Sequence, residues 1–342
     1  MGLATVSAAT TGTDYTAARL FWQGLAALAV AMAAWLLWRR VGQAGLVLFV
    51  LNPIVIYQVV HLAHLDALIG LALLVGVLLA ERGRWVWATL AFTAAALVKA
   101  PLALVVVAVL LFLAFARRYR TAANCAGAAA ALALPLVAAV GPRAMVGALS
   151  ASAGLLNKSA WAYPFRGGGR VLLLEIVDHP QQAAPRALTA LIGLAMFAVV
   201  ALVAWRLARR APAGDVGREV LTVVLAAILA LLVLGVYTSP WSFAWLLPLL
   251  PLAGARVRRW ALAHAAVFHL STRWLLFAAF AVWGSWSTGR VLDAVAASLL
   301  IAEVLLGFAT LAMVVRRPPS AGAEESLDVP CADGHSRILP GG

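Results

Sequence analysis

Long apolar runs alternate with short polar clusters along almost the whole chain. Eleven runs are candidates for crossing a membrane: residues 20–38, 44–60, 67–80, 85–98, 102–116, 122–141, 187–205, 219–237, 241–255, 260–282 and 291–315. Most of them approach the twenty or so residues that a helix needs to cross a bilayer. The pattern therefore predicts an all-α fold, a polytopic transmembrane helical bundle of about eleven spans.

Arginine supplies most of the charge, and it stands in short clusters between the apolar runs. The chain has 26 Lys and Arg against 13 Asp and Glu, but only 11% of its 342 residues are charged, whereas a soluble chain carries about 25%. The clusters lie at residues 39–40, 81–84, 117–120, 206–218, 256–259 and 316–317. This placement follows the positive-inside rule of membrane proteins and argues against a nucleic-acid partner.

Alternating the spans from a cytoplasmic 39–40 cluster places every basic cluster inside the cell. The N-terminus then lies outside and the C-terminus in the cytoplasm, with a short outward stub at 1–19 and a transmembrane domain at 20–315. Within that domain, 142–186 forms a long outward loop, and 316–342 is a polar, Pro/Gly-rich tail that we expect to be disordered. Because the other polar features also fall outside, we expect an outward-facing site.

The stretch 52–101 carries polar side chains beside apolar helix ends, namely Asn52, His61, His64, Asp66 and Lys99. Ionisable groups at membrane depth are costly and usually face a cavity, a pathway or one another. On one helix Asp66 would point away from the two histidines, so the three converge only in a loop. Three interpretations remain open: a solvated helix end, a metal site of two imidazoles and a carboxylate, or a catalytic or sugar-binding carboxylate with a histidine neighbour.

Lys99 is one of only two lysines among the 26 basic residues, the other being Lys158. Arginine serves every topological cluster, so a lysine between an apolar run and Pro101 suggests a separate task. A compact ammonium suits a phosphate group. Snorkelling of the lysine to the interface is the alternative.

Two further segments combine aromatic and polar residues on the expected outer face. Arg166 and Arg170 flank three glycines in the 142–186 loop, beside tryptophan and tyrosine. Such a loop fits a carbohydrate or lipid-phosphate ligand, and it equally fits a loop in the headgroup region. Trp241 follows Ser239 and Pro240 and is either part of a pocket rim or a residue of the interfacial aromatic belt.

Three short motifs together resemble the polyprenol-phosphate-mannose-dependent α-(1→6)-mannosyltransferases, integral membrane glycosyltransferases of the GT-C type. The motifs are Asn52-Pro53 with AHLDAL at 63–68, ALVKAP at 96–101, and PWSFAWLLPLL at 240–250. The family usually has Asn between the His and the Asp, where this chain has Leu65. Its members are also longer at the N-terminus, so we expect this chain to lack the N-terminal part of the family.

The resemblance implies a GT-C-like fold in the plasma membrane and an inverting transfer of mannose from a polyprenyl-phosphate donor lipid to a glycan or lipoglycan acceptor, at the outer face. It implies no cofactor and no metal. Asp66 would be the base or sugar anchor, with His64 as its neighbour. The residues expected to bind substrate are Lys99 with Arg166 or Arg170 at the phosphate, and His61, Asn52 and Trp241.

Two other functions fit the same residues. A transporter or flippase would use breaks at Asn52-Pro53 and 99–101 as discontinuous helices near a binding site. An inactive or accessory relative would bind lipid-linked sugar without transferring it.

Overall fold

The computed structural model describes residues 14–52, 54–61, 64–141, 186–210, 216–235, 240–271, 302 and 305–316, and among these it contains helices and no strand. The predicted all-α fold is confirmed. Within the described residues, three helices are long and apolar enough to cross a membrane: Thr16–Gln43, Tyr119–Val140 and Leu191–Arg210. A fourth span results if the bent pair Ile54–His61 and Asp66–Glu81 counts as one. The chain is therefore a helical membrane protein, but the expected count of about eleven spans is not confirmed.

The first helix, α2 (Tyr15–Val50), continues through the cluster at 39–40 that the sequence analysis places between two spans. Its axis bends at Gly42, where φ is 72°, a backbone conformation that glycine adopts at little cost. Asp14 caps the helix, because its Oδ1 accepts hydrogen bonds from the backbone N–H groups of Thr16 at 2.8 Å and Ala17 at 3.2 Å. α2 is thus two helical stretches joined at a glycine.

The run expected at 44–60 is broken at Asn52. The Asn52 Oδ1 accepts the backbone N–H of Ile54 at 2.9 Å and starts a short π-helix, η1 (Ile54–His61). The next helix, α3 (Asp66–Glu81), leaves η1 at an angle of 119°. The chain therefore turns sharply just before Asp66.

Helix α3 and helix α4 (Trp85–Val98) form a tight hairpin around Gly83, whose φ is 73°. Lys99 follows α4 in an extended conformation, and η2 (Ala100–Leu102) and α5 (Ala103–Phe115) come next. This confirms that two helices meet at Lys99. Because the hairpin returns on itself, it brings the beginning of α3 close to the end of α4.

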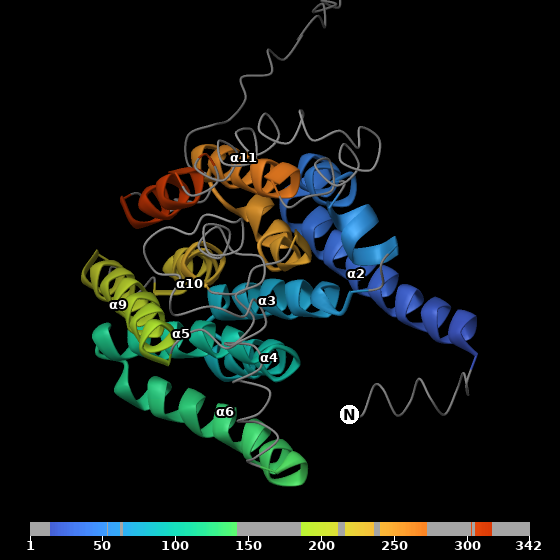
Figure 1. The fold of residues 1–342 in the computed structure, drawn as a ribbon. Coiled ribbons are helices and arrows are strands. Elements are labelled where there is room, and N and C mark those ends of the chain that lie inside the picture. Colours follow the sequence, from blue (N-terminus) through green and yellow to red (C-terminus); the bar gives the residue numbers. More distant parts are fainter. Residues whose placement is uncertain are drawn as a thin grey trace, which may run out of the picture.

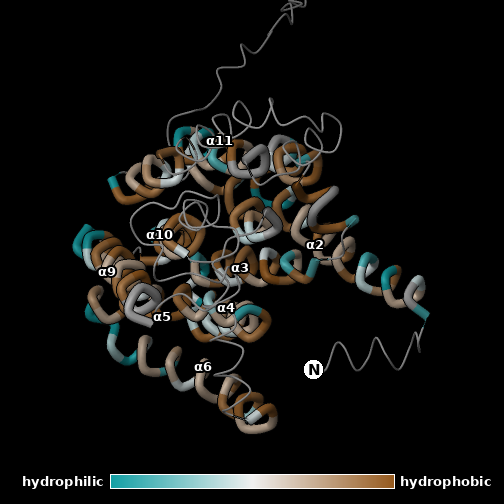
Figure 2. Tube along the Cα trace, in the orientation of Figure 1, coloured by the Kyte–Doolittle hydropathy of each residue, from teal (hydrophilic) through white to brown (hydrophobic). Residues whose placement is uncertain are grey.

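Helix α10 (Val220–Leu234) forms the centre of the bundle. All of its residues except the last, Leu234, are buried, as expected of a helix that is apolar on all sides. It packs against α3, α5 and α9 (Arg186–Arg210), as Figure 1 shows. Helix α6 (Tyr119–Val140) packs on α4 and α5 at one edge of the bundle. In Figure 2 hydrophobic colours run along the helices and hydrophilic colours gather mostly near their ends.

The run expected as a span at 241–255 is instead two short 3₁₀-helices, η5 (Pro240–Trp245) and η6 (Leu247–Leu252). Prolines explain why no long helix forms here, because Pro248 and Pro251 lack the backbone N–H that a continuous helix would need. Both elements pack against α3. Helix α11 (Ala255–Ser271) follows, and a further helix spans Leu305–Arg316.

Gly70 lets η5 approach α3 unusually closely. A Cβ on Gly70 would collide with the backbone carbonyl oxygen of Ala244 and would lie 3.1 Å from Cγ of Pro248. Gly70 stands one helical turn after Asp66, and Ala244 immediately precedes Trp245. The close approach therefore fixes the distance between the start of α3 and the end of η5.

Candidate functional site

Three side chains from three separate elements meet at the start of α3. Lys99 Nζ lies 3.1 Å from Asp66 Oδ1, and Trp245 Nε1 donates a hydrogen bond to the same oxygen at 2.6 Å. The Lys99 ammonium also lies 4.8 Å from the centroid of the Trp245 ring. We call these three residues the Asp66–Lys99–Trp245 cluster. Its members come from the three motifs that the sequence analysis singles out.

The cluster is buried on one side and open on the other. Asp66 and Trp245 are only 5% and 4% exposed, whereas the Lys99 side chain is 25% exposed. Removing one partner of a largely buried ion pair leaves an uncompensated charge, which is strongly destabilising. The pair therefore holds both charges in place, with the ammonium on the accessible side.

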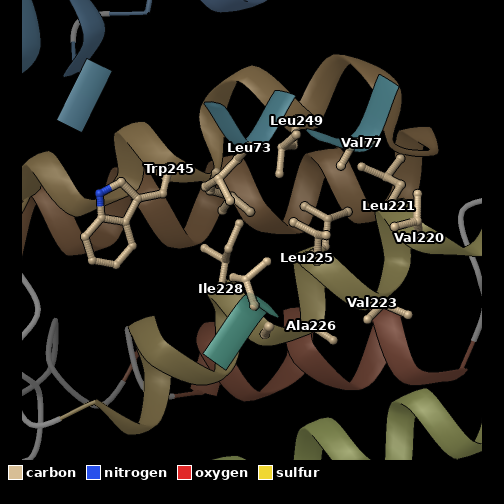
Figure 3. Close-up of a cluster of buried hydrophobic side chains, with 14 of the residues drawn as sticks. Leu73, Val77, Val220, Leu221, Val223, Leu225, Ala226, Ile228, Trp245 and Leu249 are labelled. Atoms are coloured by element: carbon tan, nitrogen blue, oxygen red, sulfur yellow. The ribbon is translucent and has the colours of Figure 1, made fainter. Parts of the chain in front are cut away.

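The Trp245 ring belongs at the same time to the apolar core. Figure 3 shows it beside Leu73 and Ile228, with its ring nitrogen on the side away from these aliphatic chains. A buried indole usually finds an acceptor for its N–H, and Asp66 supplies it here. Attraction between an ammonium and an aromatic face adds a second contact within the cluster.

The geometry leaves donors and an acceptor for a ligand. Both hydrogen bonds end on Oδ1 of Asp66, and no described residue donates one to Oδ2. The Lys99 ammonium has three N–H donors, one of which points to Asp66. An anion beside Lys99 and a hydroxyl beside Oδ2 would therefore both find partners here.

The histidines of the predicted site flank the turn into α3. His64 is half-buried, and its backbone N–H bonds to the carbonyl of Val59 at 3.0 Å. His61 is exposed, and its carbonyl accepts the side-chain amide of Gln23 at 2.6 Å. Among the described residues, no group of three or more His, Cys, Asp or Glu is arranged to hold a metal ion.

Asn52 has a structural task in this geometry, since its side-chain oxygen holds the start of η1. Arg166 and Arg170 lie outside the described residues. Trp241 lies in η5, but its side chain is outside the described part of the structure. Of the predicted site residues, the structure thus joins Asp66 and Lys99 by a direct contact.

Trp245 is the site residue that sequence reasoning missed. It stands four positions after Trp241 in the third of the family-like motifs, but its place in that motif does not by itself indicate a role in the site. One signal could have pointed to Trp245: it lies in an apolar run, and a buried indole N–H needs a hydrogen-bond acceptor. Its acceptor lies 179 positions away in the chain.

A second ion pair lies at the other end of α3. Arg40 of α2 contacts Glu81 at 3.2 Å, with side chains 50% and 19% exposed. The sixteen residues of α3 separate the two pairs by about 24 Å. Among the described residues, this more exposed pair shows no contact with an aromatic ring, and it provides an internal comparison for the buried pair.

Comparison with known proteins gives one match. Residues 1–117 match the family model described as alpha-(1->6)-mannopyranosyltransferase, N-terminal domain. The searches of curated proteins and of solved structures found no match. The matched residues include Asp66 and Lys99 and end before Trp245. The match covers the first third of the chain and the first two of the three motifs, and it agrees with the resemblance read from them.

We predict that Asp66 and Lys99 are strongly coupled in stability. In a double-mutant cycle of Asp66→Asn and Lys99→Met, each single variant leaves a buried partner without its counter-charge, and the double variant relieves this. The expected coupling free energy is about 1 to 3 kcal/mol. Unfolding of the purified protein in detergent measures it.

The matched control is the cycle of Arg40→Met and Glu81→Gln, whose exposed pair should couple by about 0 to 1 kcal/mol. Equal couplings in the two cycles would contradict the buried ion pair.

Proposed function

We propose that this chain, whose residues 1–117 match the α-(1→6)-mannopyranosyltransferase family, is a GT-C-type membrane mannosyltransferase. It takes mannose from a polyprenyl-phosphate donor and transfers it to a glycan or lipoglycan acceptor. The observation that carries the proposal is the Asp66–Lys99–Trp245 cluster, in which three separate family-like motifs converge on one ion pair. A carboxylate beside a partly accessible ammonium supplies the two charges that such a transfer needs.

The reaction is a displacement at C1 of mannose. The acceptor hydroxyl attacks C1, the bond between C1 and the phosphate oxygen breaks, and polyprenyl phosphate leaves with the bonding electrons. The hydroxyl proton passes to a base. No redox change occurs, and the configuration at C1 is inverted. The protein must therefore orient a hydroxyl and stabilise negative charge on the leaving phosphate.

Asp66 and Lys99 divide these tasks in our proposal. Oδ2 of Asp66, which receives no hydrogen bond from a described residue, accepts the hydrogen bond of a sugar hydroxyl, as base or as anchor. The ammonium of Lys99 contacts the donor phosphate, because its side chain is the accessible member of the cluster. A charge-assisted hydrogen bond of this kind is among the stronger polar contacts.

The remaining predicted residues complete the proposed binding site. His64 and His61 precede α3, and in our proposal they line the approach to Asp66. Arg166 and Arg170 would add positive charge at the phosphate, and Trp241 would lie at the rim. Asn52 acts indirectly, by holding η1 in place.

We further propose that the cluster faces the outside of the plasma membrane, with the N-terminus outside and the C-terminus in the cytoplasm. The α3–α4–α5 arrangement supports this. Its basic residues at 82–84 and 117–118 follow the ends of α3 and α5, whereas Asp66 and Lys99 lie at the opposite helix ends. Under the positive-inside rule the arginine-bearing ends are cytoplasmic.

An accessory or inactive role and a transport role remain as alternatives. The break between η1 and α3 resembles the discontinuous helices of transporters. A transporter would move the lipid-linked sugar without cleaving the bond at C1, and an accessory protein would bind it without further change. Product analysis separates all three.

We predict that membranes containing the protein transfer radiolabelled mannose from polyprenyl-phosphate-mannose to an endogenous glycan or lipoglycan. Asp66→Asn and Lys99→Ala should each lower the rate by about 10²-fold or more, as expected for loss of a base or of a charge-stabilising donor. Glu81→Gln, at the other end of α3, should retain the rate of the unmodified protein. Donor binding without transfer by the unmodified protein would refute the enzyme and favour the accessory role, and label crossing the membrane with C1 intact would favour transport.

We predict the orientation from two exposed positions at opposite helix ends: Val98, beside Lys99 and 43% exposed, and Tyr119, which is 66% exposed. In a background without Cys125 and Cys331, a membrane-impermeant maleimide should label Val98→Cys in intact cells. Tyr119→Cys should be labelled only after permeabilisation. The reverse pattern would place the cluster on the cytoplasmic side.

A further inference from the structure

We propose that Trp245 is the positioning residue of the cluster, and this inference rests on the proposed transfer function. Its indole N–H fixes the carboxylate of Asp66, and its ring face fixes the ammonium of Lys99. The two actions come from different parts of one side chain. The N–H can therefore be removed while an aromatic face is kept.

The indole N–H of Trp245 determines the orientation of the Asp66 carboxylate. Two donors from different elements, Lys99 Nζ at 3.1 Å and Trp245 Nε1 at 2.6 Å, hold the same oxygen of Asp66. Rotation of the carboxylate would break both bonds at once. Oδ2 is therefore held in one direction, which is the condition for a productive contact with a reacting hydroxyl.

The ring face determines where the ammonium lies. Lysine is a compact charge on a flexible four-carbon stem, and the Lys99 side chain is 25% exposed. The ring at 4.8 Å and the carboxylate at 3.1 Å limit the positions that its Nζ occupies. The remaining N–H donors are then available to an anion that approaches from the accessible side.

The position of Trp245 is itself set by apolar packing. Its neighbours Phe243 and Leu246 are fully buried, and the backbone of η5 touches α3 at Gly70. The ring lies beside the core side chains of Figure 3. The indole is therefore in place before any substrate arrives, as a preorganised site requires.

Two substitutions separate positioning from simple filling of the core. Trp245→Phe keeps an aromatic face but removes the N–H, and Trp245→Leu removes both. With polyprenyl-phosphate-mannose as the varied substrate, Trp245→Phe should lower kcat about tenfold or more, with the donor KM within about twofold of its original value. Trp245→Leu should lower kcat similarly and raise the donor KM by about tenfold.

The matched control is Trp87→Phe, a tryptophan of α4 that is 64% exposed and should leave both constants unchanged. The split between kcat and KM is a readout that a mere packing defect would not produce. The inference is overturned if both Trp245 variants change kcat and KM in the same proportion, or if neither variant changes them while the unmodified protein transfers mannose.

A second measurement does not depend on activity. In purified protein, Trp245→Phe should lower the melting temperature clearly when Asp66 is present and by less than half as much in an Asp66→Ala background, because its hydrogen-bond partner is then gone. Equal shifts in the two backgrounds overturn the inference. If the unmodified protein transfers no mannose, the proposed function fails, and this thermal cycle alone decides whether Trp245 positions the cluster.

Discussion

A carboxylate buried in an apolar helical bundle must be paired, and this constraint organises the region around Asp66. An unpaired charge would be expensive in such surroundings. Asp66 is therefore met by an ammonium from the end of α4 and by an indole from η5. The α3–α4 hairpin supplies the first partner, and the close approach at Gly70 supplies the second. The fold and the site thus depend on the same few contacts.

Three irregular segments of the described backbone lie beside the cluster. The π-helix η1, the extended Lys99 and the 3₁₀-helix η5 all adjoin it, whereas α10 is a regular helix. Non-helical backbone at membrane depth is tolerated where protein or a water-filled cavity surrounds it. Each break interrupts a helix and changes the direction of the chain. Residues from three segments that are distant in the sequence can therefore meet. We regard them as part of how the site is built.

The sequence predicted the helical class and much of the outline of the fold, because apolar runs and basic clusters are local signals. It also identified the break at Lys99 and named Asp66 and Lys99 as candidates. Their contact was not predictable from spacing, since it depends on how α3 and α4 pair across the hairpin. Trp245 belongs to the third motif, but its contact with Asp66 was not predictable because the two residues are 179 positions apart. The apolar run at 241–255 predicts a span, but its prolines divide it into 3₁₀-helices.

The most direct test of the central claim is an experimental structure of the protein in a lipid nanodisc with polyprenyl phosphate bound. We predict phosphate oxygens within hydrogen-bonding distance of Lys99 Nζ, with the Trp245 indole still donating to Asp66. A phosphate bound far from Lys99, or a structure in which Asp66 and Trp245 are apart, would contradict it.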